Sequence, residues 1–263
     1  MNSDSTFFSI IIVVRNGKDL IEDCVQSVIN AECHKKEIIL IDGASTDGTL
    51  NVVSKYAFAI TKIVSEPDSG LYFAMNKAIA LASGSMVGIL GCDDRLTSHA
   101  LQSVERAIEI TNQMVYFGNM RYTDRPKAAQ ILSVRPSDFP RIMIPHPATF
   151  VDRRIYTSIG NFDTRYRIAA DYDFILRATV AGYSLKKIDS ILVESTSMGI
   201  SSRPRQKFWS VSDVRKIRNR LGYHKSFVNW TEYLVFCFAI SIQLGVRTIT
   251  NFWIRLKARN ISR

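Results

Sequence analysis

Two adjacent carboxylates, Asp93 and Asp94, directly follow an uncharged stretch from Met86 to Cys92. Adjacent carboxylates repel each other, and burial disfavours the charge on each of them. One of them could cap the next helix, as Asp often does, but the better cap candidates, Thr97 and Ser98, lie several residues further on. A divalent cation would offset the repulsion, and a hard ion such as Mg²⁺ or Mn²⁺ that is bound by few protein groups commonly also holds substrate phosphates. The pair therefore predicts a metal site for a phosphorylated substrate.

Polar residues also follow three earlier apolar runs. Arg15 and Asn16 follow "FSIIIVV", Asp42 ends "EIILID", and the segment 66–68 follows a third run that ends near Val64. Continuous β-branched runs are typical of parallel strands that are covered on both faces, and patterns of helical period separate them here. This alternation predicts a doubly wound α/β sheet, in which ligands bind outside the carboxyl ends of the strands. All four polar strand ends are thus expected to line one crevice.

The regular alternation fades after about Tyr116. The segments "YFGNMRYTD" and "QILSVRP" are interpreted as edge or antiparallel strands, and residues 144–163 as a region of turns around two prolines and Gly160. A helix is expected to begin at Asp171.

Taken together, the motifs resemble those of family-2 glycosyltransferases, which have the GT-A fold and act with inversion, here of the type found in polysaccharide and O-antigen biosynthesis. The resemblance is carried, in this order, by "FSIIIVVRNG", "LIDGASTDGT", "SEPDSGLYFAMNKAIALASG" and "GCDD", and it covers about residues 8–200. It implies a mostly parallel GT-A sheet and a nucleotide-sugar donor bound with Mn²⁺ or Mg²⁺.

The resemblance also implies roles for individual residues. Asp42 would bind the donor's base, Asp93 would approach the ribose and sugar, and Asp94 would bind the metal, with Asp93 beside it. Further donor contacts are expected from Val14, Asn16, Asp68, Gly70, Lys77 and Cys92. Lys77 could add positive charge near the phosphates or simply be solvated.

Members of the family place a catalytic carboxylate at a loop-to-helix step that matches Asp171 in "RIAADYDFILRA". A general base there must reach an acceptor hydroxyl, and a helix cap is a compatible second role. His146, between two prolines, could lie near the acceptor or diphosphate, or be structural. Arg177 could also lie near the acceptor or diphosphate, or it could form a structural ion pair.

The basic charge of the chain is concentrated at its C-terminal end. The net charge is +10, and residues 203–263 hold 13 Lys and Arg against two acidic residues. Phe208, Val211, Val214, Ile217 and Leu221 recur at helical spacing, which predicts a basic amphipathic helix. The 14 uncharged residues Tyr233–Val246 are short for a bilayer span, so residues 233–254 are expected to lie on a membrane or pack against protein, with a spanning helix as the alternative.

These observations predict two parts, a GT-A glycosyltransferase domain at 1–202 and a basic helical membrane-associating extension at 203–263. The expected enzyme is a metal-dependent inverting hexosyltransferase that moves a sugar, with UDP-sugars as expected donors, to a lipid-linked glycan in cell-surface polysaccharide synthesis. The N-terminus lacks the positive region of a signal peptide and the cysteines are widely spaced, so a cytoplasmic, peripheral membrane location is expected. A homodimer stays open.

Two alternatives remain. A sugar-phosphate nucleotidyltransferase would generally have a Gly-rich loop after the first strand, whereas "VVRNGK" has one Gly. A non-enzymatic nucleic-acid or membrane-binding module would explain the basic tail, but no zinc, helix-turn-helix or RNA-binding signature accompanies that charge, so no nucleic-acid partner is expected.

Overall fold

The structure is a computed structural model that describes residues 7–108, 114–126, 130–196 and 204–222. The chain divides into two compact units, residues 1–199 and 200–263, and each unit is described by itself below. The prediction of a boundary at residue 202 falls on residues outside the described ranges.

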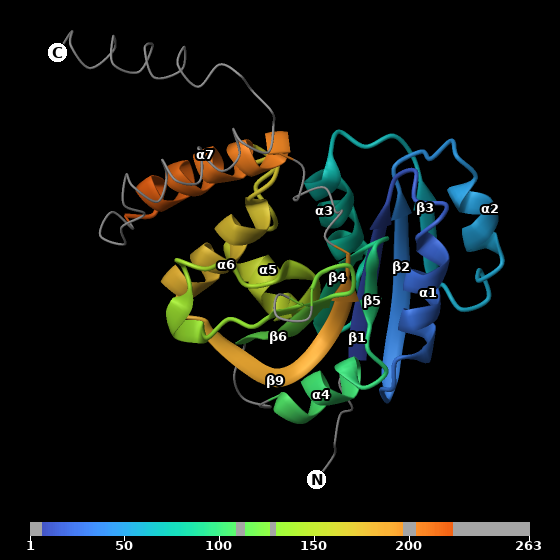
Figure 1. Ribbon diagram of the computed structural model, residues 1–263, viewed down its shortest axis with the longest axis horizontal. Helices are drawn as coiled ribbons and strands as arrows, with labels where there is room; N and C mark the ends of the chain where they lie inside the picture. The colour runs from blue at the N-terminus through green and yellow to red at the C-terminus, as the bar shows by residue number, and fades with distance from the viewer. Residues whose placement is uncertain (1–6, 109–113, 127–129, 197–203, 223–263) are drawn as a thin grey trace, which may run out of the picture. The chain divides into compact units, whose positions relative to one another are not determined.

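The first unit is built on one sheet, whose described strands follow the order β3-β2-β1-β4-β8-β6-β9-β5, with β7 paired to β6 (Figure 1). The strands are β1 Phe7–Val14, β2 Lys35–Asp42, β3 Lys62–Ser65, β4 Met86–Gly91, β5 Asp94–Leu96, β6 Met114–Tyr122, β7 Ile131–Leu132, β8 Thr149–Asp152 and β9 Ser184–Ser195. Neighbouring strands β3, β2, β1 and β4 are all parallel. Strand β8 is antiparallel to both β4 and β6, and β6 is parallel to β9. The prediction of a mostly parallel α/β sheet is confirmed.

Helices cover both faces of this sheet. They are α1 Ile21–Asn30, α2 Thr49–Ser54, α3 Leu71–Leu81, α4 Ala100–Ala107, α5 Arg153–Ile159 and α6 Ala170–Val180, with short 3₁₀ turns η2 Pro136–Asp138 and η3 His146–Ala148. On one face, Ile10 and Ile12 of β1 share a core cluster with Val25 of α1 and Leu101 of α4. On the other face, α3 packs against β1 and β2. Because β1 is covered on both sides, Ile10, Ile11 and Ile12 are all fully buried, each contributing about 1.5–3 kcal/mol to stability.

The second half of the sheet differs from the sequence-based interpretation. The β6 segment, predicted to be an edge or antiparallel strand, is antiparallel to β8, but it lies inside the sheet between β8 and β9, where its first five residues are buried. The β8 segment lies in the region predicted to be turns around two prolines, yet all four of its residues are buried. A four-residue strand is too short for an alternating pattern to reveal it.

The long strand β9 connects this half of the sheet to the acidic pair. Figure 1 shows β9 as a strongly curved strand, and its register against β6 shifts around Asn119. The end of β9 pairs with β5, where Ser195 lies opposite Asp94. The backbone of Asp94 is therefore fixed by a strand ladder immediately after β4 ends.

In the second unit the structure describes α7, Pro204–Arg220, which lies in the segment predicted to form a basic amphipathic helix. Ile217 of this helix is buried, whereas the side chains of Phe208 and Val211 and all of residues 233–254 lie outside the described part. None of the described helices combines the length and apolar character that crossing a bilayer requires.

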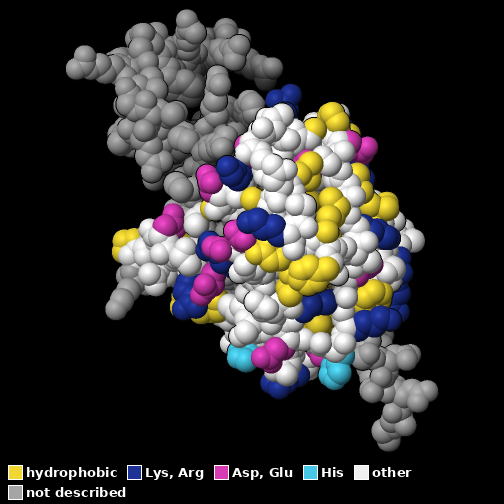
Figure 2. Space-filling view, turned by 90° about the vertical axis from the view of Figure 1, so that its right-hand side faces the viewer, with side chains coloured by type: hydrophobic (Ala, Val, Ile, Leu, Met, Phe, Trp, Pro, Cys, Tyr) yellow, Lys and Arg dark blue, Asp and Glu magenta, His cyan; other side chains and the backbone are white. Residues whose placement is uncertain are grey.

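On the face shown in Figure 2, Lys and Arg side chains are interspersed with acidic and apolar ones. This mixture agrees with the sequence, because residues 1–202 hold 21 basic and 22 acidic residues.

Candidate active site

The polar strand ends meet at one edge of the sheet. In the ladders, Val14 pairs with Asp42, Asp42 with Ser65, and Val13 with Gly91. The residues that follow β1, β2, β3 and β4 therefore leave the sheet side by side, as the sequence predicted.

Asp93 and Asp94 converge over Gly91, the last residue of β4. The Gly91 amide donates to Asp94 Oδ2 at 2.8 Å. A Cβ atom placed on Gly91 would lie 2.9 Å from Asp93 Oδ1 and 3.3 Å from Asp94 Oδ2. The two carboxylates thus approach the same point in space, which only a glycine leaves open.

This pair carries negative charge that the protein compensates poorly. Burial, followed by the charge of Asp93, raises the pKa of Asp94 to about 7, although hydrogen bonds from Ser195 and the Gly91 amide oppose the rise. Burial also raises the pKa of Asp93. Two oxygen ligands whose negative charge is unfavourable without a counter-ion fit a hard divalent cation.

Within the described residues, no group of three or more His, Cys, Asp or Glu side chains is arranged to hold a metal. An ion at Asp93 and Asp94 would consequently take its other ligands from water or from a bound phosphate, as Mg²⁺ commonly does.

Asp42, at the end of β2, keeps one oxygen free for a ligand. The residue is fully buried, and its Oδ2 accepts from the Ser45 amide at 3.0 Å and from Ser65 Oγ at 2.7 Å. Its Oδ1 is buried without a hydrogen-bond partner. A buried hydrogen-bond acceptor without a partner costs folding free energy. We therefore expect a bound ligand to donate a hydrogen bond to this atom.

Asp68 shows the same pattern one strand further along. Lys77 Nζ contacts Asp68 Oδ1 at 2.8 Å and Glu66 Oε1 at 2.5 Å, while Asp68 Oδ2 is buried without a partner. Lys77 is thus bound to two carboxylates, which explains its place on α3 without a phosphate contact. Gly70, with φ +146°, forms the sharp entry into this helix.

The loop after β1 is held by the loop after β2. Asn16 has a positive φ of 53°; its amide donates to Ser45 Oγ and its Oδ1 accepts from the Thr46 amide. The side chain of Val14 is buried in the core cluster, which leaves its backbone as the part that borders the crevice. Helix α2 has Gly48 at its N-cap, and no side chain caps it.

Cys92 fills the space beneath the same loop. A Cβ atom on Gly17 would lie 2.8 Å from Cys92 Sγ and 2.7 Å from Val14 Cγ2. Burial raises the pKa of the Cys92 thiol to about 12, so the group is neutral and acts as packing. The small neutral side chain is what lets Gly17 approach the end of β4.

Asp171 lies in the first turn of α6, as predicted. Its Oδ1 accepts from Tyr72 Oη at 2.9 Å and from the Tyr172 amide at 2.9 Å. His146 shares this environment: burial lowers its pKa and the charge of Asp171 opposes that shift, while its ring meets the Phe162 ring edge-on at 5.7 Å. Asp171 and His146 are therefore brought together from segments 25 residues apart in the sequence.

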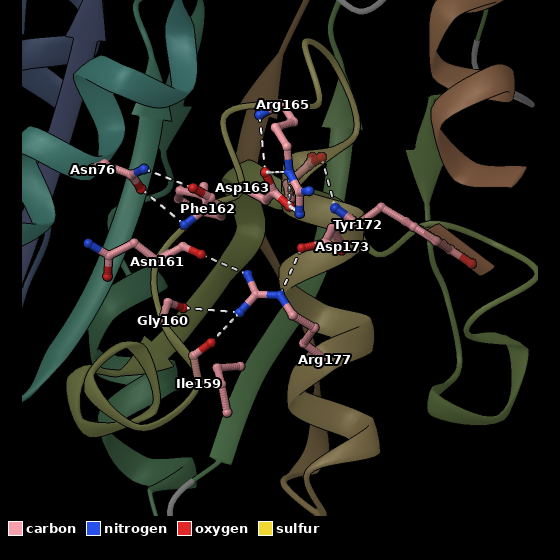
Figure 3. Close-up of polar contacts among 11 residues, drawn as sticks. Asn76, Ile159, Gly160, Asn161, Phe162, Asp163, Arg165, Tyr172, Asp173 and Arg177 are labelled. Carbon is pink, nitrogen blue, oxygen red and sulfur yellow. Dashed lines mark hydrogen bonds and ion pairs between the residues drawn. The ribbon is translucent and has the colours of Figure 1, made fainter. Parts of the chain in front are cut away.

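Arg177 is an internal anchor in this structure (Figure 3). Its guanidinium donates to the carbonyl oxygens of Ile159, Gly160 and Asn161 and to Asp173 Oδ2 at 2.8 Å. These contacts engage the nitrogens Nε, Nη1 and Nη2, and they support the ion-pair interpretation of Arg177 rather than a diphosphate contact.

Sequence reasoning assigned no role to Asn76 or Tyr72. Asn76 of α3 donates to the Phe162 carbonyl at 2.9 Å and accepts from the Phe162 amide at 3.0 Å (Figure 3). Tyr72 reaches Asp171 from the same helix. Both lie in the segment "GLYFAMNK", but the partners are 86 and 99 residues away, and such long-range pairs leave no local pattern in one sequence.

The mostly parallel GT-A sheet, the unpartnered oxygens of Asp42 and Asp68 and the acidic pair after β4 together fit one class, the glycosyltransferases that use nucleotide sugars. The chain belongs to glycosyl transferase family 2, because the sequence model of that family matches residues 9–170. It is accordingly an enzyme that transfers a sugar from a nucleotide sugar.

Two mycobacterial relatives support the assignment. A PGL/p-HBAD biosynthesis glycosyltransferase of Mycobacterium tuberculosis is 30% identical over 183 residues, which are 65% of this chain and 68% of the relative. An uncharacterized glycosyltransferase of the same species is 31% identical over 219 residues, covering 80% of this chain and 82% of the relative.

Solved structures show the same fold. TarS 1–349 of S. aureus in complex with UDP-GlcNAc aligns with a TM-score of 0.65 at 19% identity, over 80% of this chain and 66% of that one. The mannosyltransferase PcManGT of Pyrobaculum calidifontis, in complex with GDP-Man and Mn²⁺, gives a TM-score of 0.65 at 15% identity, over 99% of this chain and 81% of that one. At these identities the likeness concerns the fold, and this chain spans about two thirds of the TarS fragment.

Proposed function

We propose that the protein is a metal-dependent, inverting hexosyltransferase that moves a sugar from a UDP-sugar to a hydroxyl group of a lipid-linked glycan, in the synthesis of a cell-surface polysaccharide. The observation that carries the metal-dependent part is the convergence of Asp93 and Asp94 over Gly91, where both carboxylates are raised in pKa by burial. The bound nucleotide sugars in the two structural neighbours, one of them with Mn²⁺, support a donor of this kind.

The residues at the strand ends would hold the donor. Asp42 Oδ1 and Asp68 Oδ2 are buried acceptors without partners, suited to N–H or O–H groups of a nucleoside. Asp94, with Asp93 beside it, would hold Mn²⁺ or Mg²⁺. When bound, such an ion neutralises the charge that grows on a leaving diphosphate.

Asp171 would act as the general base. Oδ1 of its carboxylate is held by Tyr72 and the Tyr172 amide, which leaves Oδ2 to accept the proton of the acceptor hydroxyl. The hydroxyl oxygen forms a bond to the anomeric carbon as the bond from that carbon to the diphosphate oxygen breaks, and the nucleoside diphosphate leaves. A single displacement of this kind inverts the configuration at the anomeric carbon.

A screen of donors tests the proposal. Thermal unfolding of the full chain is followed with Mn²⁺ and a panel of UDP-, GDP- and dTDP-sugars, and we expect UDP-sugars to raise the midpoint because ligands that bind the native state stabilise it. The donor found is then incubated with a lipid extract, and the nucleotide product is identified. Release of nucleoside diphosphate supports the proposal. Release of pyrophosphate would instead indicate a nucleotidyltransferase.

A further inference from the structure

Tyr72 links the donor side of the site to the proposed base. It is the second residue of α3, directly after the Gly70 turn, and its side chain is only 5% exposed. Its hydroxyl lies 2.6 Å from the Ile168 carbonyl oxygen and 2.9 Å from Asp171 Oδ1. The residue therefore spans from the helix that follows Asp68 to the loop and helix that carry Asp171.

The hydroxyl has one hydrogen for two acceptors. A backbone carbonyl cannot donate, and an ionised carboxylate only accepts, so the Tyr72 hydrogen serves either Ile168 or Asp171 at a given moment. Burial raises the pKa of Tyr72 well above its usual value, and the charge of Asp171 raises it further. The hydroxyl therefore keeps its hydrogen over the whole working pH range.

Hydrogen bonds to an ionised acceptor are about twice as strong as those between neutral groups. With Asp171 ionised, the hydrogen is drawn to Oδ1 although Ile168 is the nearer acceptor. When Oδ2 gains a proton, Oδ1 becomes a neutral carbonyl oxygen, and the Ile168 carbonyl competes for the same hydrogen at the shorter distance. The two states of Asp171 thus correspond to two directions of one hydroxyl.

We propose that Tyr72 is a positioning residue for Asp171, whose hydroxyl bond selectively stabilises the ionised carboxylate and keeps Oδ2 turned to the acceptor, and whose hydrogen moves to the Ile168 carbonyl once the proton has been taken up. This inference rests on the proposed function, because it gives Tyr72 a part in the action of the proposed base.

The position of the surrounding loop does not depend on this bond. Asn76 forms two hydrogen bonds with the Phe162 backbone, and Arg177 donates to the carbonyl oxygens of the three residues that precede Phe162. The rings of Tyr72 and Tyr156 both pack against Phe162, at 5.5 and 5.9 Å. What distinguishes Tyr72 from Tyr156 is its hydroxyl bond to Asp171.

Two other titratable groups near Asp171 are held by contacts of their own. His146 of η3 interacts with its charge and is held neutral by burial, which lowers its pKa. Asp173, on α6 itself, is paired with Arg177 at 2.8 Å. The Tyr72 hydroxyl is therefore the side-chain donor that a substitution can remove while the other groups stay in place.

The test follows the Asp171 carboxyl carbon by NMR in the full chain labelled with carboxyl-¹³C aspartate, without donor or acceptor. Asp171→Asn identifies the resonance. We expect Tyr72→Phe to bind a proton at Asp171 roughly tenfold more tightly than the wild type, so that the resonance titrates at higher pH. Tyr156→Phe, the matched loss of a hydroxyl beside the same ring, should titrate with the wild type.

A second variant guards against a folding defect in Tyr72→Phe, which is checked by thermal unfolding. A 3-fluorotyrosine at position 72 is a stronger hydrogen-bond donor of nearly the same size, and it should move the titration to lower pH. Titration curves that coincide with the wild type for both changes would overturn the inference.

The outcome is separable from the proposed function because no substrate takes part in the measurement. Sugar transfer that survives Asp171→Asn would remove the proposed base, whatever the NMR titration shows. A lost transfer in Asp171→Asn together with an unmoved titration in Tyr72→Phe would remove the role of Tyr72 alone.

Discussion

Asp94 is a residue whose ionised state suits a ligand better than it suits the fold. It is 4% exposed, its pKa is raised to about 7 by burial and by Asp93, and its ordinary value is near 4. Because the folded-state pKa is above the unfolded one, the stability this group contributes in metal-free protein is present below about pH 4 and lost as the pH rises through about 7.

Asp94→Asn should therefore raise the thermal unfolding midpoint of metal-free protein at pH 8, with a smaller gain or a loss at pH 5. The same variant should lose the stabilisation that Mn²⁺ gives the wild type, because the main proposed metal ligand is gone. Differential scanning fluorimetry with EDTA or Mn²⁺ at both pH values measures both effects. An Asn variant that still responds to Mn²⁺ like the wild type would place the ion elsewhere.

Asp171 gives a prediction about chemistry without binding. Asp171→Asn should lower transfer by about 10²–10⁴-fold, the usual contribution of a general base, and leave the donor-induced thermal shift intact, since the donor contacts are assigned to the strand ends. Product release at saturating donor measures the first effect and thermal unfolding the second. The matched control is Asp163→Asn, a carboxylate of the same region that pairs with Arg165 at 2.7 Å, which should keep wild-type transfer.

At the residue scale, the sequence predicted those site residues that a local sequence pattern marks. Asp42, Asp93 and Asp94 follow apolar strands, and Asp171 precedes an apolar helix face, so a local pattern marks each of them. Roles for Tyr72 and Asn76 could not be predicted in the same way, because their hydrogen-bond partners are 99 and 86 residues away in the sequence.

At the scale of elements, α5 and α6 are connected through Arg177 of α6, which pairs with a buried carboxylate and donates to backbone carbonyls at the end of α5. Asp173 is fully buried, and the side chain of Arg177 is 17% exposed while it bonds to Asp173 and to the carbonyls that end α5. This junction carries the loop with Phe162, against which Tyr72, Tyr156, Phe174 and His146 pack. The geometry around Asp171 therefore depends on the anchor beneath it.

Arg177→Met should destabilise the protein by about 3–5 kcal/mol, because it removes the guanidinium that pairs with the buried Asp173 carboxylate. Arg165→Met removes the same kind of side chain from an ion pair with Asp163 in which the arginine is 75% exposed, and it should cost far less, because solvent screens an exposed pair. Urea unfolding of both variants gives the comparison. Equal losses would mean that the Asp173 carboxylate finds another partner when Arg177 is absent.

The sequence predicted the elements of the first half better than those of the second. Strands β1, β2 and β4 are continuous apolar runs with helical patterns between them, and parallel strands buried on both faces read in this way. Strand β8 has four residues and follows two prolines, so neither its length nor its surroundings distinguish it from a turn. Its place between β4 and β6 is decided by long-range pairing, as is the curvature that brings β9 to β5.

At the scale of the whole molecule, the charge is divided unequally along the chain. Residues 1–202 are close to neutral, while residues 203–263 carry 13 basic and two acidic residues. Each basic side chain near an anionic membrane surface contributes about 1 kcal/mol of attraction, and apolar residues among them add insertion into the headgroup region. From this composition we propose that the tail attaches the enzyme to the cytoplasmic face of the membrane, where a lipid-linked acceptor would be presented.

The full chain should float with vesicles that contain about one third phosphatidylglycerol, and a chain ending at Ser202 should remain in the soluble fraction. Because the attraction is largely electrostatic, binding of the full chain should weaken in phosphatidylcholine vesicles and at high salt. Thermal unfolding of the shortened chain, with the sugar donor that the thermal-unfolding screen selects, shows whether its catalytic domain is intact. Equal flotation of the two chains would locate membrane binding in residues 1–202 and remove the proposed role of the tail. Flotation that resists salt would instead assign the attachment to the apolar residues of the tail rather than to its charge.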